Sequence, residues 1–116
     1  MNRAQRNHNP GNLRFAGQLE AIGKDEVGMA VFPDDPAGWR ALIAQVRLDQ
    51  ERGLNIEQFV HKYAPPDEND TQAYIAFVCR GLRAASGSVP LAWFSPYCVA
   101  AVMAAYEGYF AREDAT

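Results

Sequence analysis

The feature that most constrains the fold is a series of helix signals that begins at Asp35 and continues toward the end of the chain. Apolar residues in this part recur at intervals of three and four, which is the spacing of a helix that buries one face. Each of the four runs starts with a residue type that caps helices, and two of these caps are followed directly by proline. We therefore predict four helices, which start near Asp35, Asn55, Asn69 and Ser95. The first of them is expected to end at Gly53.

The first third of the chain has a different character, with glycines, asparagines and short apolar runs. The clearest predicted strand is 27–32, and segments 13–15 and 19–22 are its expected partners, with glycines in the turns. We predict a small N-terminal antiparallel sheet or hairpin followed by about four helices, an α+β fold that is mainly α. A chain of 116 residues is long enough for one core, so we expect a single domain, 1–116.

Composition excludes some classes of function. A net charge of -3 disfavours nucleic acid as a partner, although several arginines in the first half leave a local basic face open. His8 and His61 lack metal-ligand spacing, so we expect no metal and no cofactor. Cys79 and Cys98 are expected to be free, buried thiols. No segment has the ~20 apolar residues of a membrane span, and the polar start does not resemble a signal peptide.

Several sequence blocks together carry a resemblance. Asn-Pro-Gly-Asn-Leu-Arg stands at 9–14, followed by Gly-Met-Ala-Val-Phe at 28–32 and Gly-Trp-Arg-Ala-Leu at 38–42. The longest block is Tyr-Ala-Pro-Pro-Asp-Glu-Asn-Asp-Thr at 63–71. These blocks resemble the Asn-Pro-Gly-Asn-Ile-Arg and Trp-Ala-Pro-Pro-x-Glu-Asn-Asp-Thr motifs of a family of phage and prophage virion-associated proteins, some of which are lysozyme-like or lytic transglycosylase-like.

The end of the chain matches that family in part. Its pattern closes with His-Glu-Asn-Gly on the last helix, whereas this chain has Tyr106-Glu107-Gly108-Tyr109, which keeps the glutamate and lacks the asparagine. In lysozyme-like enzymes the glutamate helix precedes a turn that contains Gly and Asn, and here that order is rotated. A circularly permuted lysozyme-like layout would explain it, provided that Glu107 lies near the turn at 9–14.

Cleavage of a glycosidic bond needs an acid that protonates the leaving oxygen. Glu107 is the predicted acid, and Tyr106, Tyr109 and Phe110 are expected to form an apolar wall that raises its pKa. Glu68 is the second catalytic candidate, with Asp70 as its alternative, although a transglycosylase route needs only one carboxyl group. The structural alternatives are a solvated Glu107 near a helix end and carboxylates that cap the third helix.

The predicted substrate-binding residues come from the two strongest blocks: Asn9, Asn12, Arg14, Asn69, Asp70, Thr71 and Tyr74. Their alternative roles are turn formation, helix capping and a local ion pair of Arg14. Aromatic side chains late in the chain would suit sugar rings, but we expect at least half of them in the core. They are Trp93, Phe94, Tyr97, Tyr106, Tyr109 and Phe110.

The resemblance implies a phage-associated domain that cleaves peptidoglycan, as a muramidase or lytic transglycosylase, with glycan strands as partner. Two alternatives stay open: a non-catalytic virion structural or glycan-binding protein that contacts other virion proteins, and a phage-encoded inhibitor of a host protein on the same fold. Such a protein is expected in the virion or host cytoplasm and acts in the periplasm only if it is delivered there.

Overall fold

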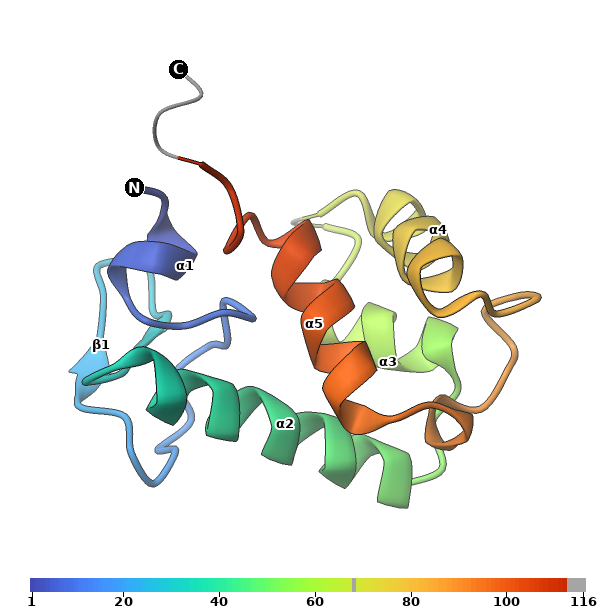
Figure 1. Ribbon diagram of the computed structural model, residues 1–116, viewed down its shortest axis with the longest axis horizontal. Helices are drawn as coiled ribbons and strands as arrows, with labels where there is room; N and C mark the ends of the chain where they lie inside the picture. The colour runs from blue at the N-terminus through green and yellow to red at the C-terminus, as the bar shows by residue number, and fades with distance from the viewer. Residues whose placement is uncertain (68, 113–116) are drawn as a thin grey trace. The chain divides into compact units, whose positions relative to one another are not determined.

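The structure is a computed structural model that describes residues 1–67 and 69–112 (Figure 1). The chain forms two compact units. Met1–Ala44 and the segment from Met103 onward make the first, which we call the terminal unit, and Gln45–Val102 make the second, the central unit. Helices α2 (Asp35–Glu51) and α5 (Pro96–Tyr106) contribute residues to both. That the whole chain folds as one domain stays a prediction.

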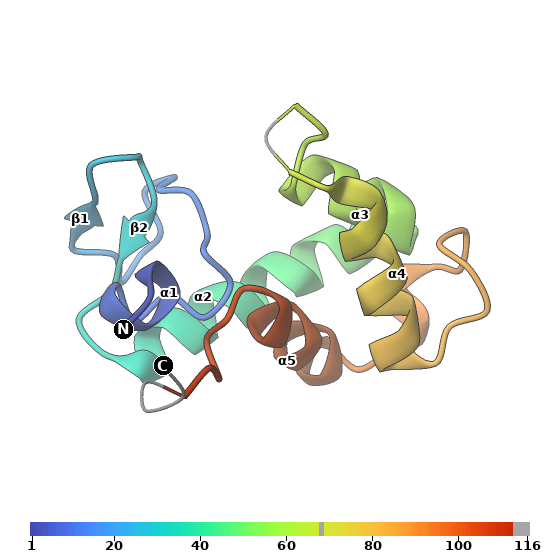
Figure 2. The same ribbon diagram turned by 90° about the horizontal axis from the view of Figure 1, so that it is seen from above.

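The terminal unit contains the predicted sheet, in a shorter form. Strands β1 (Gly23–Lys24) and β2 (Ala30–Val31) pair antiparallel (Figure 2). An isolated bridge joins Arg14 to Met29. The prediction of a small antiparallel sheet is therefore confirmed, but the strand predicted at 27–32 is too long. Gly28 has a positive φ of 94° within the turn that joins the strands, so regular pairing starts only after it.

The terminal unit also begins with a helix that the sequence analysis did not predict. Helix α1 spans Arg3–Arg6, one turn, and is closed by a capping box between Asn2 and Gln5. Four residues are too few to show an apolar repeat, which explains why periodicity missed them. Among the buried apolar residues of this unit, Ala30, Phe32 and Ala37 pack together in one cluster.

The residue that caps α2 lies one position before the predicted one. The Asp34 side chain, not that of Asp35, accepts the capping hydrogen bond, from Ala37 N at 2.9 Å. The helix ends before Gly53, as predicted, and the φ of +77° at Gly53 is the left-handed conformation that commonly terminates helices.

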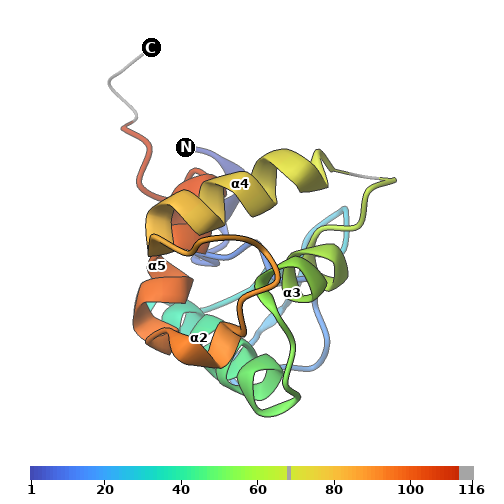
Figure 3. The ribbon, with the colours of Figure 1, turned by 90° about the vertical axis from the view of Figure 1, so that its right-hand side faces the viewer.

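The central unit contains α3 (Ile56–Tyr63) and α4 (Thr71–Leu82), which pack against each other (Figure 3). The predicted helix start at Asn55 is confirmed, and Asn55 and Gln58 form a capping box there. The predicted cap at Asn69 is wrong by one residue, because the Asp70 side chain accepts the hydrogen bond, from Ala73 N. Buried apolar side chains line both helices; they include Ile56, Phe59, Val60, Ile75 and Val78.

A short 3-10 helix, η1 (Leu91–Trp93), precedes α5, where the Ser95 hydroxyl accepts from Tyr97 N at 3.2 Å as a cap would. The described residues thus contain five α-helices, the four predicted ones and α1, beside the two-stranded sheet. This confirms the prediction of an α+β, mainly α fold. Among the described residues, none of the helices has both the length and the apolar character needed to cross a membrane.

Two expectations about burial are wrong. Of the six late aromatics, Trp93, Tyr97 and Phe110 are 73%, 59% and 56% exposed, and the other three are half-buried. Both cysteines are free, as expected, but Cys98 is exposed and Cys79 is half-buried. The buried face of α5 consists of Val99, Ala100, Met103 and Ala104, so Tyr97 and Cys98 lie outside it.

Candidate functional site

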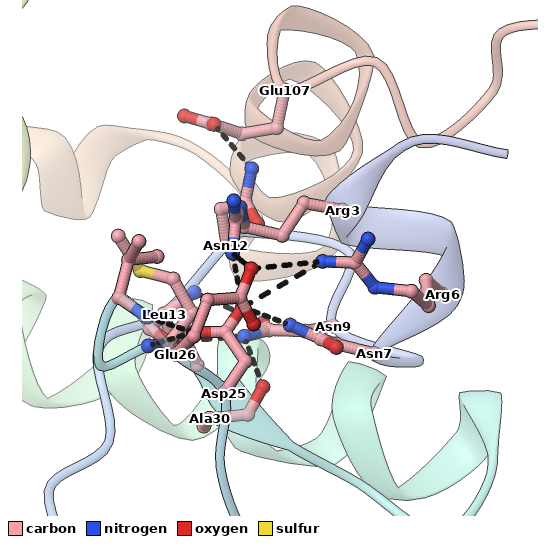
Figure 4. A network of polar contacts seen from close by, with 12 residues as sticks. Arg3, Arg6, Asn7, Asn9, Asn12, Leu13, Asp25, Glu26, Ala30 and Glu107 are labelled. Atoms are coloured by element: carbon pink, nitrogen blue, oxygen red, sulfur yellow. Dashed lines mark hydrogen bonds and ion pairs between the residues drawn. The ribbon is translucent and has the colours of Figure 1, made fainter.

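The turn at residues 9–13 is built around the side chain of Asn9, which is 0% exposed. Its Oδ1 accepts from Leu13 N at 3.0 Å, while its Nδ2 donates to Leu13 O and to Ala30 O, both at 2.9 Å (Figure 4). Both N–H groups of this amide donate a hydrogen bond, and its oxygen accepts one of the two that it can accept. We therefore assign Asn9, a predicted substrate-binding residue, the role of joining the turn to β2.

Asn12, three residues later, points toward Glu107. Its Nδ2 donates to Glu107 Oε1 at 3.1 Å, although the two residues are 95 positions apart in the chain (Figure 4). Asn12 has a φ of +50°, a left-handed conformation that asparagine tolerates better than most residues. Among the described residues its Oδ1 is buried without a hydrogen-bond partner, which is uncommon and marks positions where water or a ligand group often binds.

Glu107 follows directly after α5 and is half-buried. The helix ends here because Gly108 takes a positive φ of 84°, and Tyr109 N donates back to Ala104 O at 3.0 Å. The carboxyl group thus lies near the negative end of the α5 dipole, where a charged carboxylate is disfavoured. The amide N–H of Asn12 can hold the carbonyl oxygen of a neutral carboxyl as well as an ionised one.

The aromatic residues after Glu107 pack on α2. The rings of Tyr109 and Phe110 lie 5.4 and 6.0 Å from the Trp39 ring, the first at a right angle to it. Burial raises the pKa of the Tyr109 hydroxyl, and its hydrogen bond to Asp35 adds to the rise. The predicted wall beside Glu107 therefore stays a prediction, while these two rings have a demonstrated partner in Trp39.

Asp35 also contacts His8, which the sequence analysis considered only as a metal ligand. His8 Nδ1 lies 2.9 Å from Asp35 Oδ1, and both side chains are about half exposed. The start of α2 is thereby connected to the N-terminal turn and to the segment after Glu107. Among the described residues, no group of three or more His, Cys, Asp or Glu side chains is arranged to hold a metal ion.

A second polar network joins α1 and Asn7 to the loop before β2 (Figure 4). The Asp25 carboxylate, of which 6% is exposed, accepts from Asn7 Nδ2 and from the backbone N–H groups of Val27 and Met29, and it pairs with Arg3. Burial opposes ionisation of Asp25, but these donors outweigh it and hold the pKa of the carboxyl well below its usual range. The network fixes the loop before β2.

The other predicted binding residues of the terminal and central units occupy ordinary structural positions. Arg14 is exposed and lies opposite Met29 in the isolated bridge. Asn69 Nδ2 donates to Pro65 O at 3.1 Å, and the hydroxyl of the buried Thr71 donates to Ala64 O at 2.7 Å. Tyr74 is buried, with its ring edge-on to that of Tyr63.

These contacts agree with the capping alternative for the block at 69–71, since Asp70 is the N-cap of α4. Glu68, the second predicted catalytic residue, lies outside the described residues. Of the predicted site residues, the structure brings Glu107 and Asn12 into contact, with Asn9 and Arg14 in the same unit; Asn69, Asp70, Thr71 and Tyr74 belong to the central unit.

Asn2 and Gln5, which were not among the predicted site residues, also contact the segment after Glu107. Asn2 Nδ2 donates to Gly108 O, and Gln5 Nε2 donates to Tyr109 O. Their spacing was a signal that could have found them, because Asn-x-x-Gln is a capping pattern that also occurs at the start of α3.

Comparison with known proteins adds no family assignment: no protein-family model matches the chain, and no curated protein matches it.

Proposed function

We propose that this chain is a phage-associated, lysozyme-like domain that cleaves the glycan strands of peptidoglycan, with Glu107 as the general acid. The observation that carries the proposal is the hydrogen bond from Asn12 Nδ2 to Glu107 Oε1 at 3.1 Å. A circularly permuted lysozyme-like layout requires the late glutamate to meet the early asparagine-containing turn, and this contact satisfies that requirement. The lysozyme-like fold is itself part of the proposal.

The proposed reaction starts with a neutral Glu107 carboxyl. It gives its proton to the glycosidic oxygen while the bond from that oxygen to the anomeric carbon breaks. In a hydrolytic reaction, water then bonds to the anomeric carbon and loses a proton to a base, for which Glu68 is the candidate from the sequence. In a transglycosylase reaction, a hydroxyl group of the same sugar bonds to that carbon and returns its proton to Glu107.

The other residues have proposed roles at the substrate. Asn12 offers the buried Oδ1 to a water or to an N–H group of the substrate. Arg14, which is exposed, is a candidate to pair with a carboxylate of the peptide stem through its planar guanidinium. The proposed contacts of the block at 69–74 with glycan rest on the motif alone, because Asp70 and Thr71 also serve to start α4.

A second candidate function is binding to glycan or to virion proteins without cleavage. It is favoured by Gly108, which stands where the family motif has an asparagine after the glutamate. An enzyme that has lost a polar residue next to its acid can keep the fold and the binding surface while it loses the chemistry.

The test uses purified murein sacculi and measures soluble fragments by chromatography and mass. We expect the wild-type protein to release fragments and Glu107→Gln to release them at least about 100-fold more slowly, the usual contribution of a general acid. Glu51→Gln is the matched control, because it makes the same chemical substitution at a glutamate that is exposed at the end of α2. Fragment masses that differ by one water distinguish hydrolysis from transglycosylation.

The other outcomes are equally informative. Sedimentation of the protein with sacculi without release of fragments supports the binding candidate. Release that is unaffected by Glu107→Gln shows that Glu107 is not the acid. A wild-type protein that neither binds nor cleaves sacculi contradicts both candidates.

A further inference from the structure

The backbone after Glu107 is held by two side-chain amides from the first helical turn. Asn2 Nδ2 donates to Gly108 O at 2.7 Å. Gln5 Nε2 donates to Tyr109 O at 3.1 Å and to Ala111 O at 2.7 Å. Three carbonyl groups within residues 108–111, a segment without regular structure, thereby receive donors from residues more than 100 positions away.

The same two side chains use their oxygens on α1 itself. Asn2 Oδ1 accepts from Gln5 N, and Gln5 Oε1 accepts from Asn2 N, both at 3.0 Å. Each amide therefore caps α1 through its oxygen and holds the far segment through its nitrogen. A helix of four residues is not stable alone, so formation of α1 is coupled to its contact with 108–111.

We propose that Asn2, Gln5 and Asn12 act as an amide clamp that positions Glu107. Asn2 and Gln5 fix the backbone that follows the glutamate, and Asn12 fixes its carboxyl group. Proton transfer requires an acid held within a fraction of an ångström of its productive geometry, which explains why both parts are needed. The clamp's catalytic role rests on the proposed function, whereas its hold on residues 107–111 does not.

The double variant Asn2→Asp with Gln5→Glu tests the clamp selectively. Both substitutions keep the oxygens that cap α1, remove the nitrogens that donate, and place carboxylate oxygens near the carbonyls of 108–111. The matched control is Asn55→Asp with Gln58→Glu in α3, whose capping box uses the same two oxygens at 2.7 and 2.9 Å. Both double variants change the net charge equally.

Amide hydrogen exchange measures the hold on the segment directly. In the wild type the N–H groups of Glu107, Gly108 and Tyr109 are hydrogen bonded to carbonyls of α5. We expect these amides to exchange about tenfold faster in the Asn2/Gln5 variant and at wild-type rates in the Asn55/Gln58 control. For murein cleavage we expect kcat to fall about tenfold while KM stays within about twofold.

A single variant isolates the contact to the carboxyl group. Asn12→Gly suits the left-handed backbone and removes only the side-chain amide. We expect it to lower kcat by about tenfold without faster exchange at 108–111.

Exchange at 107–111 that is unchanged in the Asn2/Gln5 variant overturns the clamp. Faster exchange with unchanged kcat overturns its positioning role. If the wild-type protein does not cleave murein, the proposed function fails, and the exchange rates by themselves still decide whether the clamp holds this segment.

Discussion

Replacement of Asn9 by alanine should destabilise the protein far more than the same change at an exposed asparagine. The variant loses all three hydrogen bonds of a completely buried amide, to Leu13 N, Leu13 O and Ala30 O. At about 1 kcal/mol for each bond, we expect the free energy of unfolding to fall by about 3 kcal/mol. Leu13 O also accepts from Ala30 N, so the most costly loss is the partner of Leu13 N.

The control is Asn69→Ala, because Asn69 is exposed and its side chain makes one hydrogen bond, to Pro65 O. We expect a loss below about 1 kcal/mol there. Urea unfolding followed by circular dichroism measures both variants, with the slope of the transition compared to exclude a change in the unfolded state. A loss at Asn9 no larger than that at Asn69 would refute the conclusion that Asn9 holds the turn.

Three further predictions follow from single side chains. Asn12→Asp places a second carboxyl group beside Glu107, and repulsion between the two anions should raise the pKa of Glu107. We therefore expect the alkaline limb of the pH profile of murein cleavage to move to higher pH. An unchanged profile would contradict the contact. Asp25 has a lowered folded-state pKa, so its stabilisation is present above the unfolded value of about 4 and is lost as pH falls toward the folded value. Asp25→Asn should therefore be less stable than the wild type at neutral pH. Thermal unfolding measured at decreasing pH should show this difference in stability shrinking, and a difference that stays constant would contradict the role of Asp25. Gly38→Ala should lower the free energy of unfolding by about 2 kcal/mol or more, because the added Cβ would clash with His8 O, a backbone atom that cannot rotate away. In the control Gly81→Ala the added Cβ meets only the Val102 side chain, at 2.8 Å. Thermal denaturation compares the two variants, and a larger loss in Gly81→Ala would contradict this reasoning.

The sequence by itself determined the helices from residue 35 onward. The capping box of Asn55 and Gln58, the cap at Ser95 and the stop at Gly53 are local features, since each depends on residues within one turn. For the same reason the errors are small: Asp34 and Asp70 cap where a neighbour was predicted, because adjacent residues of similar chemistry compete for the position.

Only the tertiary structure decided the roles of the asparagines in the first turn. Asn9 and Asn12 are equivalent in the motif, yet one is buried against β2 and the other reaches Glu107. The meeting of residues 95 positions apart depends on how the terminal unit packs, which no local pattern encodes. The exposure of Tyr97 was decided in the same way, because Val99, Ala100, Met103 and Ala104 form the face of α5 that is buried.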